Sequence, residues 1–224
     1  MNWMENRIGI GILLALLMAP GAGASELTAV VEKVQPAVVT LVTYDINREK
    51  TGFGSGFFVD GDGHLITNYH VMDGAYSAEV RTLSGDTYPV VRVVAENRDA
   101  DLIKVRVDIP EERYRWLQMS GALPSIAEQI VVVGSPMGLE QTVSEGIVSA
   151  IRDMPGIGKF FQISAPISRG SSGGPVVNTD GHVIGVVTFM MLFGQNLNFA
   201  ISAQGAAGLA PEGIGKSVSE WTYA

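Results

Sequence analysis

The chain of 224 residues contains no cysteine. Disulfide bonds, thiolate metal sites and a cysteine nucleophile are therefore excluded. Only 17% of the residues are charged, and acidic residues outnumber basic ones by 23 to 15, which gives a formal charge of −8. A protein of this sign repels polyanions, so we expect no nucleic-acid partner. The three histidines lack the spacing of metal ligands, and we expect neither a metal nor an organic cofactor.

Long apolar runs are also absent, except near the N-terminus. There Arg7 precedes an apolar stretch at residues 8–18 (IGIGILLALLM), and Ala22-Gly23-Ala24 follows. This pattern predicts a signal peptide over residues 1–24, cleaved after Ala24, and a periplasmic or secreted protein. Glu5 leaves the first segment weakly basic, so an uncleaved membrane anchor is the alternative. The stretch is shorter than the ~20 residues that span a bilayer, and we expect no stable membrane span in the mature chain.

What the chain does contain is abundant apolar residues, 46% of the total, and 27 glycines. The first allow a sizeable core, and the second favour an architecture rich in turns. After a short amphipathic helix predicted at residues 25–34, the helical period disappears. Short β-branched runs between turn residues then predict twelve strands, at 38–43, 54–59, 64–67, 78–82, 87–94, 102–107, 130–133, 142–150, 160–164, 175–178, 182–189 and 197–201.

These strands form two groups of six, separated by a connector at residues 108–128. The grouping predicts an all-β fold of two six-stranded antiparallel β-barrels packed side by side, the first at about 37–108 and the second at about 129–202. We expect a single domain over residues 25–204. Residues 205–224 show no clear period and are expected to form a C-terminal tail, which either caps the domain or lies loosely on it.

The sharpest local pattern is GSSGGP at residues 170–175. A serine hydroxyl becomes an effective nucleophile only when a base removes its proton and the resulting oxyanion is stabilised. Glycines around a serine allow a sharp turn in which successive N–H groups converge on one point. We therefore interpret Ser172 as a candidate nucleophile and the N–H groups of Gly170 and Ser172 as an oxyanion hole. A Gly/Ser loop without function is the alternative, but predicted strands flank it on both sides.

A general base has to be one of three histidines. His64 and His182 both follow Asp-Gly or Gly in turns, where a polar residue needs no function. His70 instead comes directly after an apolar strand, at the rim of the first predicted barrel. We therefore select His70.

The carboxylate that orients this imidazole is expected to be Asp101, which heads the strand at 102–107. Asp99 is the nearest rival and would otherwise be a solvated turn residue. The candidates follow one another as His, Asp and Ser, one of the known orders for this triad. Two of them belong to the first barrel and one to the second, so we expect the active site in the cleft between the barrels.

Several separate segments carry a family resemblance: residues 54–72, 97–105, 131–151, 161–186 and 197–202. The chain resembles the trypsin-like protease domain of the HtrA/Deg family, which has the chymotrypsin fold. The resemblance implies a serine endopeptidase with His70 as base, Asp101 as its orienter and Ser172 as nucleophile. It also implies unfolded or damaged extracytoplasmic polypeptides as substrates, and a possible homo-oligomer. The sequence ends about twenty residues after these motifs, so no PDZ domain is expected.

In this fold the specificity pocket lies between the segment before the nucleophile and the strand after it. The corresponding residues are Pro166, Ile167, Thr188, Phe189 and Met190. Neither stretch contains a carboxylate, so a buried basic side chain would have no partner. The sequence therefore predicts cleavage after small or medium apolar residues.

Chymotrypsin-like digestive enzymes pair a newly cut N-terminal amine with an Asp next to the nucleophile. Here Ser171 stands at that position and has no charge to offer an amine. We therefore expect that no zymogen cleavage of that type is needed. The alternative to an enzyme is a catalytically weak holdase of the same fold, which grips extended peptides in its cleft. The presence of His70, Asp101 and Ser172 together favours the enzyme.

Overall fold

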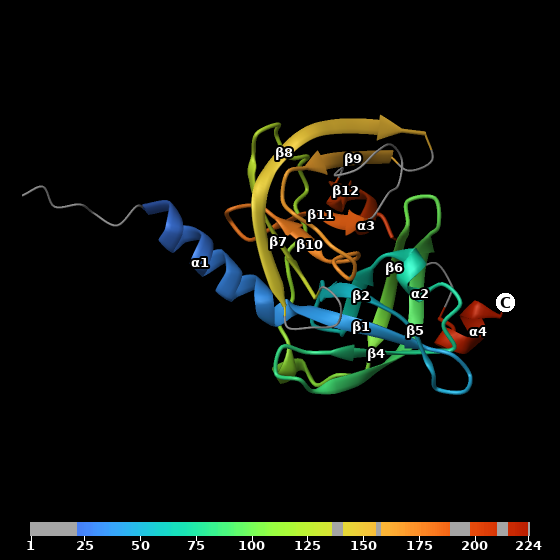
Figure 1. Ribbon diagram of the computed structural model, residues 1–224. Helices are drawn as coiled ribbons and strands as arrows, with labels where there is room; N and C mark the ends of the chain where they lie inside the picture. The colour runs from blue at the N-terminus through green and yellow to red at the C-terminus, as the bar shows by residue number, and fades with distance from the viewer. Residues whose placement is uncertain (1–21, 136–140, 156–157, 189–197, 210–214, 224) are drawn as a thin grey trace, which may run out of the picture.

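The computed structural model describes residues 22–135, 141–155, 158–188, 198–209 and 215–223. Two closed antiparallel β-barrels of six strands each lie side by side, which confirms the predicted all-β architecture (Figure 1). Their strand orders around the barrels are β1-β2-β3-β6-β5-β4 and β10-β11-β12-β9-β8-β7. The strands are β1 (Val38–Tyr44), β2 (Lys50–Phe58), β3 (His64–Thr67), β4 (Ser77–Arg81), β5 (Thr87–Asn97), β6 (Leu102–Val107), β7 (Gln129–Gly134), β8 (Thr142–Met154), β9 (Gly158–Ile163), β10 (Pro175–Val177), β11 (Val183–Thr188) and β12 (Asn198–Ser202).

Three strands are longer than their apolar patterns predict. β2 begins at Lys50, four residues before the predicted strand, while β5 and β8 continue three and four residues beyond theirs. The added residues are mostly exposed or half-buried. Backbone pairing with neighbouring strands continues where side-chain burial has ended, so an apolar pattern underestimates such strands.

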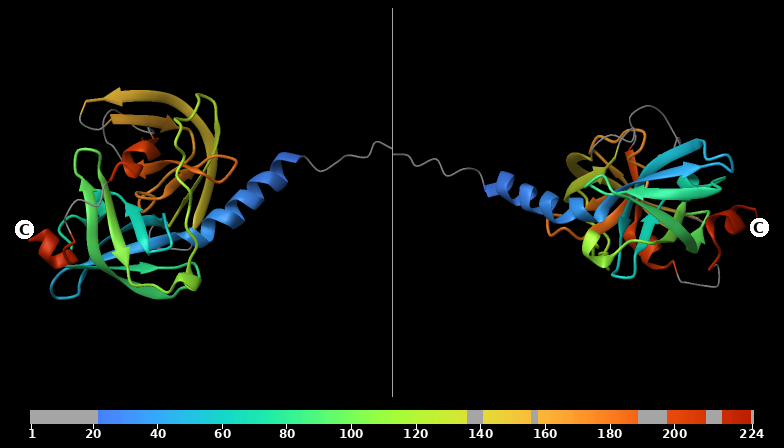
Figure 2. Two further views of the ribbon diagram at one scale, coloured as in Figure 1. Left: turned by 180° about the vertical axis from the view of Figure 1, so that it is seen from behind. Right: turned by 90° about the horizontal axis from the view of Figure 1, so that it is seen from below.

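The helix α1 (Ala22–Val34) projects from the junction of the barrels in all three views (Figures 1 and 2). It begins three residues before the predicted helix, so the predicted cleavage site after Ala24 lies within it. Val30 and Val34 at its C-terminal end are buried in the core, and Lys33 donates a hydrogen bond to the Asp180 carbonyl. No helix in the described ranges is long and apolar enough to cross a membrane.

The core has three parts. One cluster fills each barrel, and a third joins the two. The joining cluster packs Phe57 and Leu102 of the first barrel with Val186 and Ile201 of the second, all with 1% exposure or less. Burial of several such side chains, each worth about 1.5–3 kcal/mol, fixes the barrels relative to one another. A site assembled from both barrels therefore has a rigid frame.

Short helices complete the domain: η1 (Gln35–Ala37), α2 (Tyr69–Met72), η2 (Glu111–Arg113), α3 (Ala203–Ala207) and α4 (Val218–Thr222). The described part of the predicted C-terminal tail packs on the barrels. Trp221 of α4 is buried in the core of the first barrel, and its indole N–H donates to Glu96 Oε2. Its ring meets Tyr69 edge to face at 5.6 Å between centroids, so α4 lies against the helix that carries His70.

Candidate active site

The turn before β6 and the short helix α2 are joined through the backbone of Asp101. This residue has a φ of +54°, in the left-handed region that residues other than glycine rarely adopt. Its carbonyl accepts hydrogen bonds from the backbone N–H of Tyr69, at 3.1 Å, and from Asn68 Nδ2, at 2.9 Å. These two bonds tie the turn to the start of α2, so the Asp101 and His70 side chains are held next to each other.

The Asp101 carboxylate accepts three hydrogen bonds. His70 Nδ1 lies 2.7 Å from Oδ2, the His70 backbone N–H is 2.9 Å from Oδ1, and the Thr188 hydroxyl is 2.8 Å from Oδ2. An ionised carboxylate only accepts, so Nδ1 carries the proton in this pair and Nε2 is left as an acceptor. The arrangement orients the imidazole as a general base requires.

Thr188 has a different contact from the one expected of a pocket wall. It lies at the end of β11 in the second barrel, and it is 1% exposed. Its hydroxyl donates to Asp101 across the interface between the barrels. Sequence reasoning missed this contact because no local pattern relates two residues that are 87 positions apart.

The loop around Ser172 is shaped by glycines. Gly170 and Gly173 have φ values of +97° and +84°. A Cβ at Gly173 would lie 2.2 Å from the Ser55 carbonyl oxygen, so only glycine fits at that position.

Three N–H groups of this loop already have hydrogen-bond acceptors in the protein. Those of Ser171, Gly173 and Gly174 donate to backbone carbonyls at 2.9–3.0 Å. Within the described residues, the N–H groups of Gly170 and Ser172 donate to no protein acceptor. They are the two groups that the sequence predicts as the oxyanion hole, and both are available to a ligand.

His70 and Ser172 line the same cleft, which has a volume of about 730 Å³. The other lining residues are Lys50, Thr51, Gly52, Phe53, Arg169 and Gly170. His70 and Ser172 thus reach one cleft from different barrels, and no hydrogen bond links their side chains among the described contacts. Such bonds are often long in a free enzyme and tighten when substrate binds.

The other predicted pocket residues are only partly described. Pro166 is exposed and its carbonyl accepts a hydrogen bond from the Ser144 hydroxyl at 2.7 Å. Ile167 is half-buried against the core of the second barrel. Phe189 and Met190 lie outside the described residues.

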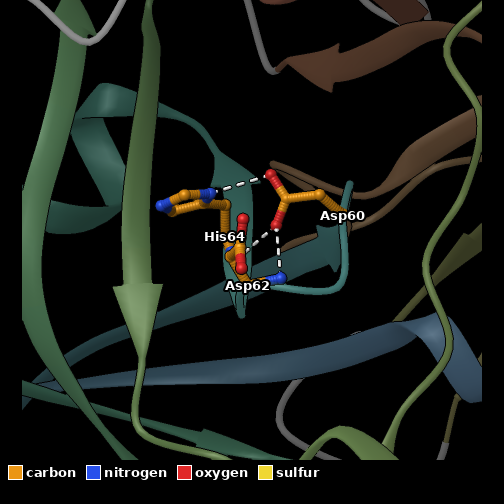
Figure 3. Close-up of side chains that lie close together, drawn as sticks. All are labelled: Asp60, Asp62 and His64. Atoms are coloured by element: carbon orange, nitrogen blue, oxygen red, sulfur yellow. Dashed lines mark hydrogen bonds and ion pairs between the residues drawn. The ribbon is translucent and has the colours of Figure 1, made fainter.

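The rival candidates have other surroundings. Asp99 is exposed, and Asp101 is the carboxylate that contacts His70. His64 contacts Asp60 at 2.8 Å in the turn between β2 and β3, where Asp62 lies nearby (Figure 3).

The turn of Figure 3 has a structural explanation. Asp60 Oδ1 accepts the backbone N–H groups of Asp62 and His64, at 3.0 and 3.2 Å, while Oδ2 contacts the imidazole. The carboxylate is thus engaged in closing a tight turn. This grouping of side chains needs no ligand to account for it.

Comparisons with known proteins identify the family of the chain. The profile of the family described as trypsin-like peptidase domain matches residues 54–186. Serine protease HTRA1B of Danio rerio is 36% identical over 187 residues, which cover 77% of this chain and 38% of that protein. Mitochondrial serine protease HTRA2 of Bos taurus is 36% identical over 215 residues, which cover 89% of this chain and 46% of that protein.

Among solved structures, the serine endoprotease from Yersinia pestis superimposes with a TM-score of 0.70 at 28% identity, over 80% of this chain and 63% of that one. The chain spans less than half the length of the two curated relatives. The HtrA-named serine proteases are similar to this chain, and the family profile covers more than half of it. With the two-barrel topology described above, the chain therefore belongs to the family of trypsin-like peptidase domains.

Proposed function

We propose that this protein is a serine endopeptidase in which Ser172 is the nucleophile, His70 the general base and Asp101 the group that orients and stabilises the imidazolium. The observation that carries the proposal is the short contact of His70 Nδ1 with Asp101 Oδ2, 2.7 Å, in a cleft that Ser172 also lines. The serine protease names of its relatives support the same reaction class.

In the proposed reaction, Ser172 Oγ attacks the carbonyl carbon of the scissile peptide while His70 Nε2 takes the hydroxyl proton. The N–H groups of Gly170 and Ser172 donate to the developing oxyanion. His70 then gives its proton to the leaving amine as the C–N bond breaks, which leaves an acyl ester on Ser172. A water molecule, deprotonated by His70, hydrolyses the ester and restores the hydroxyl.

We propose unfolded or damaged polypeptides outside the cytoplasm as substrates, and cleavage after small or medium apolar residues. The polypeptide substrate class is that of the serine proteases the chain resembles, and the scissile bond would lie in the cleft that His70 and Ser172 line. The apolar preference rests on the absence of a carboxylate at residues 166–167 and 188–190.

The direct test is digestion of casein, which is an unfolded substrate, with a folded globular protein as the comparison. The products are identified by mass spectrometry. We expect products from the unmodified protein and none from Ser172→Ala, with kcat lower by roughly 10⁶-fold. Equal digestion by both proteins would overturn the assignment of Ser172. A strict preference for Arg or Lys before the cut would overturn the proposed specificity.

We further propose export, with residues 1–24 as a signal peptide. N-terminal sequencing of protein recovered outside the cytoplasm should begin at Ser25. This form should be fully active, because Ser171 has no charge with which to bind a terminal amine and its hydroxyl accepts the Ser168 N–H locally at 3.3 Å. Activity that depended on a further N-terminal cut would contradict this expectation.

A further inference from the structure

Ser55 of β2 lies at the junction of the two barrels and is completely buried. All of its polar groups are used. Its N–H donates to the Ser172 carbonyl at 2.8 Å, and its carbonyl accepts the Thr67 hydroxyl at 2.7 Å. Its own hydroxyl donates to the Gly170 carbonyl at 2.6 Å and accepts the Ser135 N–H at 2.9 Å. One residue of the first barrel therefore holds two carbonyls of the nucleophile loop.

These two carbonyls flank the groups that matter for the reaction. The Gly170 carbonyl belongs to the peptide that follows the Gly170 N–H, and the Ser172 carbonyl to the peptide that follows the Ser172 N–H. Gly170 has no Cβ to restrict its backbone, which could rotate and carry its N–H away from the cleft. A hydrogen bond to its carbonyl holds the peptide plane that follows Gly170 and so restricts this freedom.

We propose that the Ser55 hydroxyl is a positioning group that keeps the oxyanion hole formed; this inference rests on the proposed function. The hydroxyl acts through Gly170 and does not touch substrate. Its fit is close, because a Cβ placed on Gly134 would lie 3.2 Å from Ser55 Oγ. The backbone bond to Ser172 could be made by other residues, but the bond to Gly170 needs a small side chain that donates.

The test compares Ser55→Ala with Ser135→Ala. The two serines lie next to each other in the same buried junction, but the Ser135 hydroxyl has no hydrogen-bond partner among the described residues. Both changes delete one buried oxygen, and only the first deletes the bond to Gly170. The measurements are kcat and KM for a peptide substrate, the pH profile of kcat/KM, and the affinity for a peptide aldehyde, whose tetrahedral adduct uses the oxyanion hole.

For Ser55→Ala we expect kcat to fall roughly 10²-fold, as for a small misplacement of reacting groups, with KM within twofold of the original. Aldehyde affinity should fall in parallel, and the pH profile should keep its shape because the His70–Asp101 pair is intact. Ser135→Ala should keep kcat within threefold. An unchanged kcat in folded Ser55→Ala would overturn the proposal while leaving Ser172 as nucleophile.

A second variant covers the case in which Ser55→Ala does not fold. Ser55→Cys keeps a side chain of similar shape with a weak S–H donor. Its kcat should lie below that of the original protein, with KM unchanged. The positioning role would be overturned if kcat equalled that of the original protein, including the case in which only KM is raised.

A different observation carries a second inference, which also rests on the proposed function. The cleft wall contains two cations, Lys50 and Arg169, and no carboxylate among its described residues, although the protein as a whole has an excess of acids. Neither cation forms an ion pair within the described part of the chain. Lys50 Nζ lies 4.8 Å from the centroid of the Phe53 ring, which also lines the cleft.

The position of these cations suggests which part of a substrate they meet. Pro166 and Ile167, which belong to the proposed apolar pocket, do not line the described cleft. Both cations do line it, together with Ser172 and His70. We propose that they form a subsite for a carboxylate side chain on the leaving-group side of the scissile bond.

Two peptides that differ only in Glu or Gln at the second position after the cut test this subsite. At low salt we expect kcat/KM to favour the Glu peptide by about 5-fold for each ion pair. The preference should shrink at about 0.5 M NaCl, because salt screens exposed charges. The double change Lys50→Gln and Arg169→Gln should abolish it, whereas Lys159→Gln, on an exposed strand end, should not. Equal rates for both peptides would overturn the subsite alone; cleavage of neither would overturn the proposed function as well.

Discussion

The hydrogen bond from Thr188 to Asp101 is the contact through which the second barrel acts on the His70–Asp101 pair. Thr188→Val replaces the hydroxyl with a methyl group of nearly the same size. The change leaves Asp101 Oδ2 with His70 as its remaining donor, and it places a methyl group against a carboxylate. Both effects should weaken the support that Asp101 gives to the imidazolium formed during the reaction.

The magnitude follows from the surroundings. A hydrogen bond to a charged group contributes about 1.5–3 kcal/mol. The Asp101 side chain is 26% exposed, so water partly replaces the lost donor and the lower part of this range applies. About 1.4 kcal/mol corresponds to a tenfold change in rate. We therefore expect kcat/KM of Thr188→Val to be lower by roughly 10-fold.

The assay is steady-state hydrolysis of a fluorogenic peptide, with thermal unfolding of each variant measured alongside. Thr40→Val is the matched control, because Thr40 is also buried but its hydroxyl makes no hydrogen bond among the described contacts. It should keep kcat/KM within twofold. A folded Thr188→Val protein with the kcat/KM of the control would refute the role given to this hydroxyl.

Three further predictions concern the frame of the site. Gly173→Ala should reduce kcat by at least roughly 10²-fold in the same assay, because the new Cβ would lie 2.2 Å from the Ser55 carbonyl and displace the nucleophile loop. Trp221→Ala should lower the unfolding free energy by about 3–5 kcal/mol in urea titrations, and a loss under 1 kcal/mol would mean that α4 does not belong to the folding unit. The pKa of Glu220 is lowered by hydrogen bonds from the backbone N–H and hydroxyl of Ser217, so its stabilising effect is present above the ordinary carboxyl pKa and is lost as the pH falls. In urea titrations between about pH 6 and pH 3, the unfolding free energy of Glu220→Gln should therefore depend less on pH than that of the original protein.

The sequence predicts the two-barrel fold well because alternating burial and turn residues are local features. β3 and β6 have the predicted ends, since Gly63 and Asp101 mark their starts with positive φ. The candidate His70 is selected from its position after a strand with a clear apolar pattern, and the candidate Ser172 from the local pattern GSSGGP at residues 170–175.

Other features leave no such local signal. The hydroxyl of Ser55 meets Gly170 across 115 positions, and Thr188 meets Asp101 across 87. Trp221 packs near the start of α2 from the far end of the chain. Each of these contacts depends on how the two barrels and the C-terminal segment come together, which the order of residues alone does not specify.

Reaction with a fluorophosphonate probe tests the central assignment most directly, because the probe forms a covalent bond only with an activated serine. Peptide mapping of the labelled protein should place the adduct on Ser172, and labelling should be lost in both Ser172→Ala and His70→Ala. An adduct on another serine, or a folded protein that does not react at all, would contradict the account.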